Sequence, residues 1–144
     1  MPIKKSSLLA VMAGGALLAT APPAQANDDL EAMLSGQSVL KGKKLKRAIE
    51  KADAHPLGSE QNPVRAEQPQ GQRAYLAALR CADGGQPMFQ RRGSMGIGVF
   101  GNIVDAYELQ CEGDEPAATV VYMDMYHRGF VETRPLPGFT IAER

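Results

Sequence analysis

The spacing of apolar residues is helical in the first part of the chain. An Asn-Asp-Asp run at 27–29 can cap a short helix whose apolar residues lie at i, i+3 and i+4, namely Leu30, Met33 and Leu34. A second set extends this spacing to i+7 and consists of Leu45, Ala48, Ile49 and Ala52. Its helix should end before His55-Pro56, because the residue before a proline is biased away from helical backbone. We therefore expect a helical N-terminal segment over residues 27–55.

The next stretch, residues 56–71, is punctuated by proline and glycine. Its residues of these two types are Pro56, Gly58, Pro63, Pro69 and Gly71. Both types interrupt regular structure and are typical of turns. We expect a linker, or a loop that wraps around the folded body.

From residue 73 onward, apolar and polar residues alternate, which is typical of strands that bury one face. The segment 73–81 places Tyr75, Ala77, Leu79 and Cys81 on one side, although its alanine and leucine content would also suit a helix. Three further strand-like segments are 87–92, 102–111 and 117–126. Turn residues lie between them, with Asp83-Gly84-Gly85 after the first segment and residues 112–116 after the third. This order predicts an antiparallel meander.

All eight aromatic residues lie in the second half of the chain. They are Tyr75, Phe89, Phe100, Tyr107, Tyr122, Tyr126, Phe130 and Phe139. Because large rings supply much of the buried area in a small core, we place the core in a β-rich domain over residues 72–144. A body of about 70 residues is near the size at which a single core needs a covalent staple.

The N-terminus has the pattern of a signal peptide over residues 1–26. Lys4 and Lys5 form a positive region, an apolar stretch over 8–19 follows, and Ala24-Gln25-Ala26 matches an A-x-A cleavage site. The apolar stretch is about a dozen residues, shorter than the roughly 20 that span a bilayer. We expect cleavage near Ala26, a periplasmic or secreted protein, and no transmembrane segment after processing.

Cys81 and Cys111 are the two cysteines, and an even count in an exported protein favours a disulfide. Two strands that flank a third lie about 9.6 Å apart, whereas bridged Cα atoms are usually within about 7 Å. The sheet must therefore curl, or the bridge must pass beyond the end of the middle strand. The expected fold class is α+β: short N-terminal helices followed by a small curled antiparallel β-sheet, a barrel- or sandwich-like meander with one disulfide.

Charge narrows the range of partners. The 16 basic residues equal the 16 acidic ones, so no basic field favours nucleic acid. We expect no nucleic-acid partner and no cofactor. The expected partner is an unidentified protein or small molecule of the cell envelope.

A glycine-rich run, Gly96 to Gly101, matches G-x-G-x-x-G, the pattern of dinucleotide-binding loops. Those loops lead into a helix, whereas the residues that follow here are strand-like, so nucleotide binding is disfavoured. One interpretation is a plain flexible connection. The other is a ligand-binding rim with two arginines at its base for bidentate anion contacts. Its candidate residues are Arg91, Arg92, Ser94, Gly96, Gly98 and Gly101.

The run Met123-Asp124-Met125-Tyr126-His127 suggests a metal site. On one strand, Met123, Met125 and His127 would project from the same face. Thioether and imidazole ligands suit Cu(I), so these residues are the candidate metal ligands of a periplasmic copper-binding protein. The competing interpretation is that both methionines pack in the core and His127 points to water.

A third hypothesis is a small exported hydrolase. It would use His127 or His55 as a base and Asp105 or Asp124 to orient the imidazole. The chain has no G-x-S-x-G or H-E-x-x-H motif. We therefore assign no catalytic residue.

The stretches His55 to Arg65 (HPLGSEQNPVR) and Met123 to His127 (MDMYH) resemble small exported bacterial proteins of uncharacterised function. The resemblance covers residues 55–141 and implies export and a compact domain, but no activity or ligand. Together these observations favour a small exported, non-enzymatic domain that binds a partner or ligand or has a structural role. Copper binding and hydrolysis are the alternatives.

Overall fold

A computed structural model of the chain describes residues 24–113 and 118–142. Three helices lie in these ranges: α1 (Ala24–Leu34), α2 (Gly42–Ala52) and α3 (Gln68–Ala78). The expected short N-terminal helices are therefore present, and α2 ends before His55-Pro56 as expected. The expected signal peptide lies, up to residue 23, outside the described residues.

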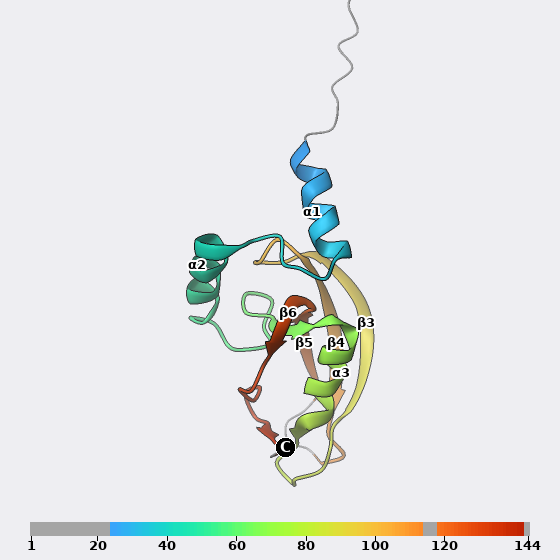
Figure 1. The fold of residues 1–144 in the computed structure, drawn as a ribbon. Coiled ribbons are helices and arrows are strands. Elements are labelled where there is room, and N and C mark those ends of the chain that lie inside the picture. Colours follow the sequence, from blue (N-terminus) through green and yellow to red (C-terminus); the bar gives the residue numbers. More distant parts are fainter. Residues whose placement is uncertain (1–23, 114–117, 143–144) are drawn as a thin grey trace, which may run out of the picture.

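The main sheet has five strands and is mixed and open (Figure 1). Its strands, in the spatial order β3-β4-β5-β1-β6, are β3 (Met88–Ile97), β4 (Ile103–Gln110), β5 (Thr119–Asp124), β1 (Val64–Glu67) and β6 (Tyr126–Val131). The pairs β3–β4 and β4–β5 are antiparallel, as the meander predicts. The expectation of a purely antiparallel, barrel- or sandwich-like sheet is wrong, because β1 pairs parallel with β5 and antiparallel with β6.

The stretch expected to be a linker contains β1, which lies inside the main sheet. Val64 and Ala66 are buried, so this segment contributes to the core. The turn before it depends on Gly58, whose φ is 86° and whose amide donates to the Asn62 carbonyl at 2.8 Å. A Cβ at this glycine would come within 2.6 Å of the Leu136 side chain. Proline and glycine here shape the entry into a strand.

The segment 73–81 is mostly helix α3, not the expected strand. Pro69 lies in its first turn, where a missing amide hydrogen costs nothing. The buried residues Gln72, Tyr75 and Leu76 recur at three and four positions, and this helical spacing was hidden by the alternation of smaller residues. Only β2 (Leu79–Arg80) is extended, and it pairs with β7 (Thr140–Ile141) in a separate two-stranded sheet.

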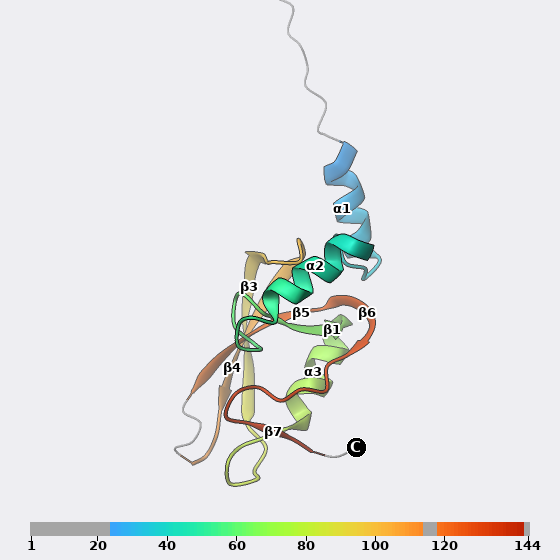
Figure 2. The same cartoon turned by 90° about the vertical axis from the view of Figure 1, so that its left-hand side faces the viewer.

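The core lies between α3, the C-terminal segment and one face of the main sheet (Figure 2). Strands β4 and β5 supply alternate residues to it, Tyr107 and Leu109 from β4 and Val121 and Met123 from β5. Its buried members are Val64, Tyr75, Leu76, Leu79, Cys81, Tyr107, Leu109, Cys111, Val121, Met123, Leu136 and Phe139. Most of them lie within the expected β-rich region, and Val64 of β1 is the exception.

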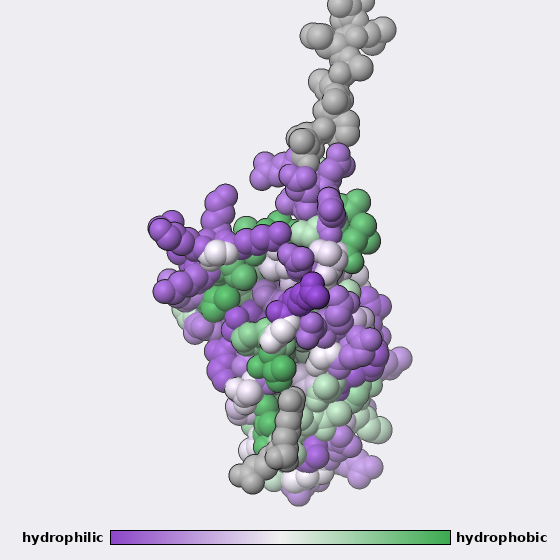
Figure 3. All heavy atoms as spheres, viewed as in Figure 1, coloured by the Kyte–Doolittle hydropathy of each residue, from purple (hydrophilic) through white to green (hydrophobic). Residues whose placement is uncertain are grey.

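Helix α2 has a solvated basic side. Its exposed cations are Lys43, Lys44, Lys46, Arg47 and Lys51. Figure 3 shows hydrophilic residues over α2 and hydrophobic residues below it. No helix within residues 24–113 and 118–142 is long and apolar enough to cross a membrane.

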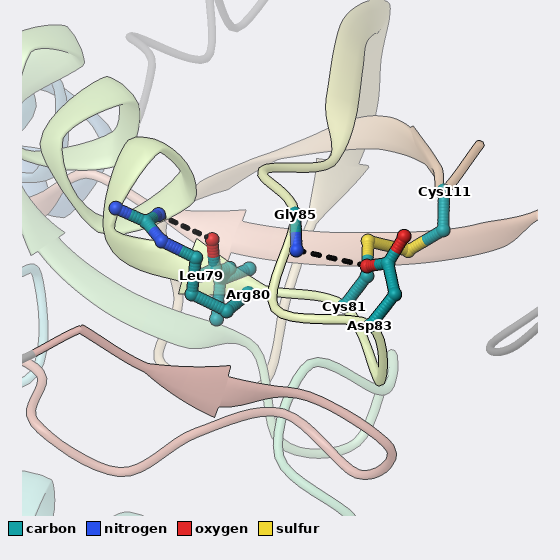
Figure 4. Close-up of a disulfide and its surroundings, with 6 residues drawn as sticks. All are labelled: Leu79, Arg80, Cys81, Asp83, Gly85 and Cys111. Atoms are coloured by element: carbon teal, nitrogen blue, oxygen red, sulfur yellow. Dashed lines mark hydrogen bonds between the residues drawn. A yellow bond between two sulfur atoms is a disulfide. The ribbon is translucent and has the colours of Figure 1, made fainter. Parts of the chain in front are cut away.

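The expected disulfide between Cys81 and Cys111 is present, with Cα atoms 6.0 Å apart (Figure 4). The conflict expected from strand spacing does not arise, because the segment before Cys81 belongs to α3 and β2 and not to the main sheet. Cys81 leads directly into a turn in which the Gly85 amide donates to the Asp83 carboxylate at 2.8 Å. The bridge thus joins this turn to the end of β4.

Candidate functional site

The glycine-rich run begins in the last residues of β3, makes the turn after it and leads into strand β4, as the argument against nucleotide binding requires. The two arginines proposed for anion binding are engaged by carboxylates of β4. Arg91 Nη2 lies 2.7 Å from Asp105 Oδ1, and Arg92 Nη1 lies 3.0 Å from Glu108 Oε2. The hydrogen bond to Asp105 raises the pKa of Arg91. An anion would therefore have to compete with a carboxylate at each arginine.

The remaining rim candidates are spread along the turn side of β3. Ser94 is paired with Asp105 of β4, and Gly96 lies two residues further along the strand. Gly98 and Gly101 bracket the turn, with the Gly101 amide donating to the Gly98 carbonyl at 3.0 Å. Ligand binding by this rim stays a prediction.

The three candidate metal ligands do not lie on one strand. Met123 lies in β5 and is completely buried in the core, and His127 lies in β6. Met125 occupies the break between the two strands. The regular spacing on which the copper hypothesis depends is thus interrupted, and copper binding stays a prediction.

Of the groups considered for hydrolysis, His127 and Asp124 come together. Nε2 of His127 lies 3.3 Å from Oδ2 of Asp124, and both side chains are buried. The angle does not suit a hydrogen bond, so Nε2 has no partner of good geometry. His55 is exposed and lines a different hollow, beside α2. Asp105 is held by Arg91.

Asn102 and Ser38 complete a buried polar cluster with Asp124 and His127. The Asn102 amide nitrogen donates to Asp124 Oδ2 at 2.8 Å and to Ser38 Oγ at 3.2 Å. Its oxygen accepts the Val39 amide hydrogen, with 2.8 Å between the heavy atoms. The polar cluster therefore ties the segment between α1 and α2 to the main sheet.

A hollow of about 430 Å³ opens between α3 and β6, and we call it the apolar groove. Small residues of β1 and α3 line part of it, while Phe130 and Val131 of β6 form a wall. Its residues are Arg65, Ala66, Glu67, Gln68, Gln70, Gly71, Ala74, Tyr75, Phe130, Val131 and Glu132. Val131 is 53% exposed there and adds apolar surface to the wall.

The rim of the apolar groove is strained at Gln68. This residue has a φ of 57°, a conformation that costs a non-glycine residue about 1–2 kcal/mol. Its amide donates to the Met125 carbonyl at 2.8 Å, and its side chain lies over Gly36, where any Cβ would collide with it. The strain is thus held by contacts from two other parts of the chain.

Glu132 is buried at the end of the apolar groove, and its charge is already matched. Arg134 binds both of its carboxylate oxygens, through Nε at 3.0 Å and Nη2 at 2.9 Å. The amides of Thr133 and Arg134 also donate to Oε1. Burial alone would raise the pKa of Glu132, but the hydrogen bonds from Arg134 outweigh it and lower that pKa. This carboxylate is therefore not free for a ligand.

Arg65 separates the apolar groove from a second hollow. Its guanidinium carbon lies 4.1 Å from the centroid of the Phe130 ring, a cation–π contact. Burial lowers the pKa of Arg65, while the Glu132 carboxylate acts in the opposite direction. In the described ranges Arg65 has no ion-pair partner. It is a partly desolvated cation with no carboxylate bound to it.

The second hollow, of about 380 Å³, lies between the start of α2 and β6, and we call it the basic hollow. Three cations line it, and its lining contains no carboxylate. Its residues are Gln37, Ser38, Leu40, Lys41, Gly42, Leu45, Arg65, Tyr126, His127, Arg128 and Phe130. Arg65 and Phe130 belong to both hollows and form the wall between them.

Sequence reasoning missed both hollows. Arg65 lay in the expected linker, and no motif marks Asn102, Phe130 or Arg128. The available signal was the alternation of Val64 and Ala66 with Arg65, which is that of a strand with one buried face. Neither protein-family models nor curated proteins nor solved structures show a match to the chain.

Proposed function

We propose that this protein is a small exported, non-enzymatic domain that binds a small-molecule ligand in the apolar groove. The observation that carries the proposal is the groove itself, with its volume of about 430 Å³ and an unpaired arginine on its aromatic wall. Ligand sites are typically hollows of about 300–1,000 Å³ that combine apolar walls with a few polar groups. Export rests on the signal-peptide pattern of residues 1–26.

The walls suit a ligand with an apolar body. Phe130, Val131 and the Ala74 methyl group offer apolar contact, and Gln68 and Gln70 offer amide groups at the rim. Burying apolar ligand surface contributes roughly 25 cal/mol of favourable binding free energy per Å². Because Val131 is exposed without a ligand, the same contact would also remove protein surface from water.

A binding role is better supported than hydrolysis. The Asp124 carboxylate accepts hydrogen bonds from Asn102 and from the Tyr126 amide. Ser38, the hydroxyl of the polar cluster, is bonded to Asn102 and not to the imidazole. The two thiols that could act as nucleophiles are joined in the disulfide. These contacts give the polar cluster a structural role.

The experiment uses a neutral, environment-sensitive dye such as N-phenyl-1-naphthylamine. Its fluorescence should rise and saturate on titration of the parent protein. Ala74→Trp places an indole in the groove from α3 and should abolish the saturable rise. The matched control is Ala82→Trp, the same exchange at an exposed position of the turn after β2, which should bind the dye as the parent does. Equal dye binding in both variants would refute the groove as the site.

A further inference from the structure

The basic hollow brings three positively charged side chains together. Lys41, Arg65 and Arg128 line it, and within residues 24–113 and 118–142 none of the three forms an ion pair. By contrast, Arg91, Arg92 and Arg134 are all paired with carboxylates. Three cations without an ion pair thus lie together at this hollow, whereas other unpaired cations of the described ranges, such as Lys43, Arg47 and Arg73, lie outside it.

The backbone of α2 adds to the same hollow. Helix α2 begins there, at Gly42, and no side chain caps its first amides. Free amides at a helix N-terminus attract anions. His127 also lines the hollow, but its buried Nε2 lies 3.3 Å from Asp124 Oδ2, so it is not counted among the donors to a ligand. An oxyanion is the ligand group that complements both the three cations and the free amides of α2.

The wall between the hollows explains how one molecule could use both. Arg65 stacks on Phe130, and stacking occupies the faces of the guanidinium but leaves its in-plane N–H donors available. Those donors are at the boundary of the apolar groove and the basic hollow. One ligand could therefore place a charged group in the basic hollow and an apolar chain in the apolar groove, with Arg65 and Phe130 between them.

We infer that the ligand is an amphipathic oxyanion, a carboxylate or phosphate monoester on an apolar body, whose head occupies the basic hollow. This inference rests on the proposed function, because the body of the same molecule lies in the apolar groove. The cations of the hollow supply charge-assisted hydrogen bonds to the head, and Arg65 orients the molecule across the wall.

The test compares ligands that share a ten-carbon chain and differ in the head: decyl phosphate, decanoate and decanol, all below micelle-forming concentrations. Each competes with the neutral dye on the parent protein. The two anions should displace the dye at concentrations about tenfold or more below that of decanol, since tenfold corresponds to about 1.4 kcal/mol and one charged hydrogen bond contributes at least that. The double variant Lys41→Gln/Arg128→Gln should lose this preference.

Lys44→Gln/Arg47→Gln is the matched control, because it removes one lysine and one arginine charge from exposed positions of α2 that lie outside both hollows. It should keep the preference of the parent. Dye binding and the melting temperature of the double variant report whether its groove is intact. If the double variant does not fold, the single variants Lys41→Gln and Arg128→Gln are tested in its place. Each single variant should then lose part of the preference.

Three outcomes would overturn the inference. If dye binds but decanol competes as well as the anions, the head has no charge preference, while the proposed function stands. If the double variant keeps the full preference, the anion is bound elsewhere. If inorganic phosphate alone displaces bound decyl phosphate at similar concentrations, the ligand is a free anion without an apolar body. Absence of saturable dye binding in the parent would instead refute the proposed function.

Discussion

Replacing Asn102 with alanine should destabilise the protein strongly, because this one amide joins three parts of the chain. It donates to Asp124 of β5 and to Ser38, and it accepts from the Val39 amide in the segment between α1 and α2. Asn102 and Asp124 are completely buried. In the alanine variant, the Val39 amide and one carboxylate oxygen would lose a partner that water cannot easily replace.

The expected loss follows from the kind of each bond. Two are bonds between neutral groups, which contribute about 1 kcal/mol each, and the bond to the carboxylate contributes about 1.5–3 kcal/mol. Asn102→Ala should therefore lower the free energy of unfolding by about 3–5 kcal/mol. Small domains have a total of about 5–15 kcal/mol. With about 2.1 cal/mol/K of unfolding entropy per residue over roughly 115 residues, a loss of 3 kcal/mol lowers the melting temperature by about 12 °C.

Urea and thermal unfolding followed by far-UV circular dichroism measure both quantities. Ser38→Ala is the control, since it removes only the 3.2 Å bond to the serine hydroxyl, and it should cost about 1 kcal/mol or less. A loss below about 1 kcal/mol for Asn102→Ala would refute the reasoning. It would mean that the N-terminal segment contributes nothing through this cluster.

Three further predictions concern the staple, acid stability and copper. Reduction of the Cys81–Cys111 bridge should lower the free energy of unfolding by about 3–4 kcal/mol; unchanged urea midpoints with and without reductant would contradict this. Because the pKa of Glu132 is lowered in the folded state, its ionised carboxylate contributes fully to folding stability above the unfolded-state pKa of about 4.3. This contribution to stability is lost as the pH falls through the folded-state pKa. The stability difference between the parent and Glu132→Gln should thus shrink between pH 6 and pH 3 in urea titrations, and a constant difference would argue against it. Cu(I) should leave the melting temperature unchanged in the parent and in Met123→Leu/Met125→Leu, because Met123 is a core residue; a copper-dependent rise lost in the double variant would restore the metal hypothesis.

The hairpins of the sheet were predictable because their signals are local. Alternation and turn residues place strands at 87–92, 102–111 and 117–126, and the structure has β3, β4 and β5 at Met88–Ile97, Ile103–Gln110 and Thr119–Asp124. Antiparallel neighbours joined by short turns need no information from elsewhere in the chain. The pairing of the two cysteines was predictable for a different reason, since there are only two.

The position of β1 was not predictable from local pattern. It pairs with Met123 and Asp124 of β5 and with Tyr126 and Val131 of β6. These partners are about sixty residues away in sequence. The slot for β1 exists because the chain breaks at Met125 between β5 and β6. Helix α3 was missed because the small residues of this segment fit both the strand period of two and the helical period of 3.6. The helix is favoured by the burial of Gln72, whose side-chain oxygen accepts a hydrogen bond from the Tyr107 hydroxyl at 3.0 Å.

The candidate site follows from the same non-local strand. Alternation along β1 buries Val64 and Ala66 and leaves Arg65 less buried, on the other face. On that face Arg65 meets Phe130, because β6 lies directly beside β1. A shift of β1 by one residue would bury the arginine and expose Val64, so the core holds the register that keeps the cation between the two hollows. Binding at this site and stability of the sheet therefore depend on one strand, and substitutions at Val64 should weaken both.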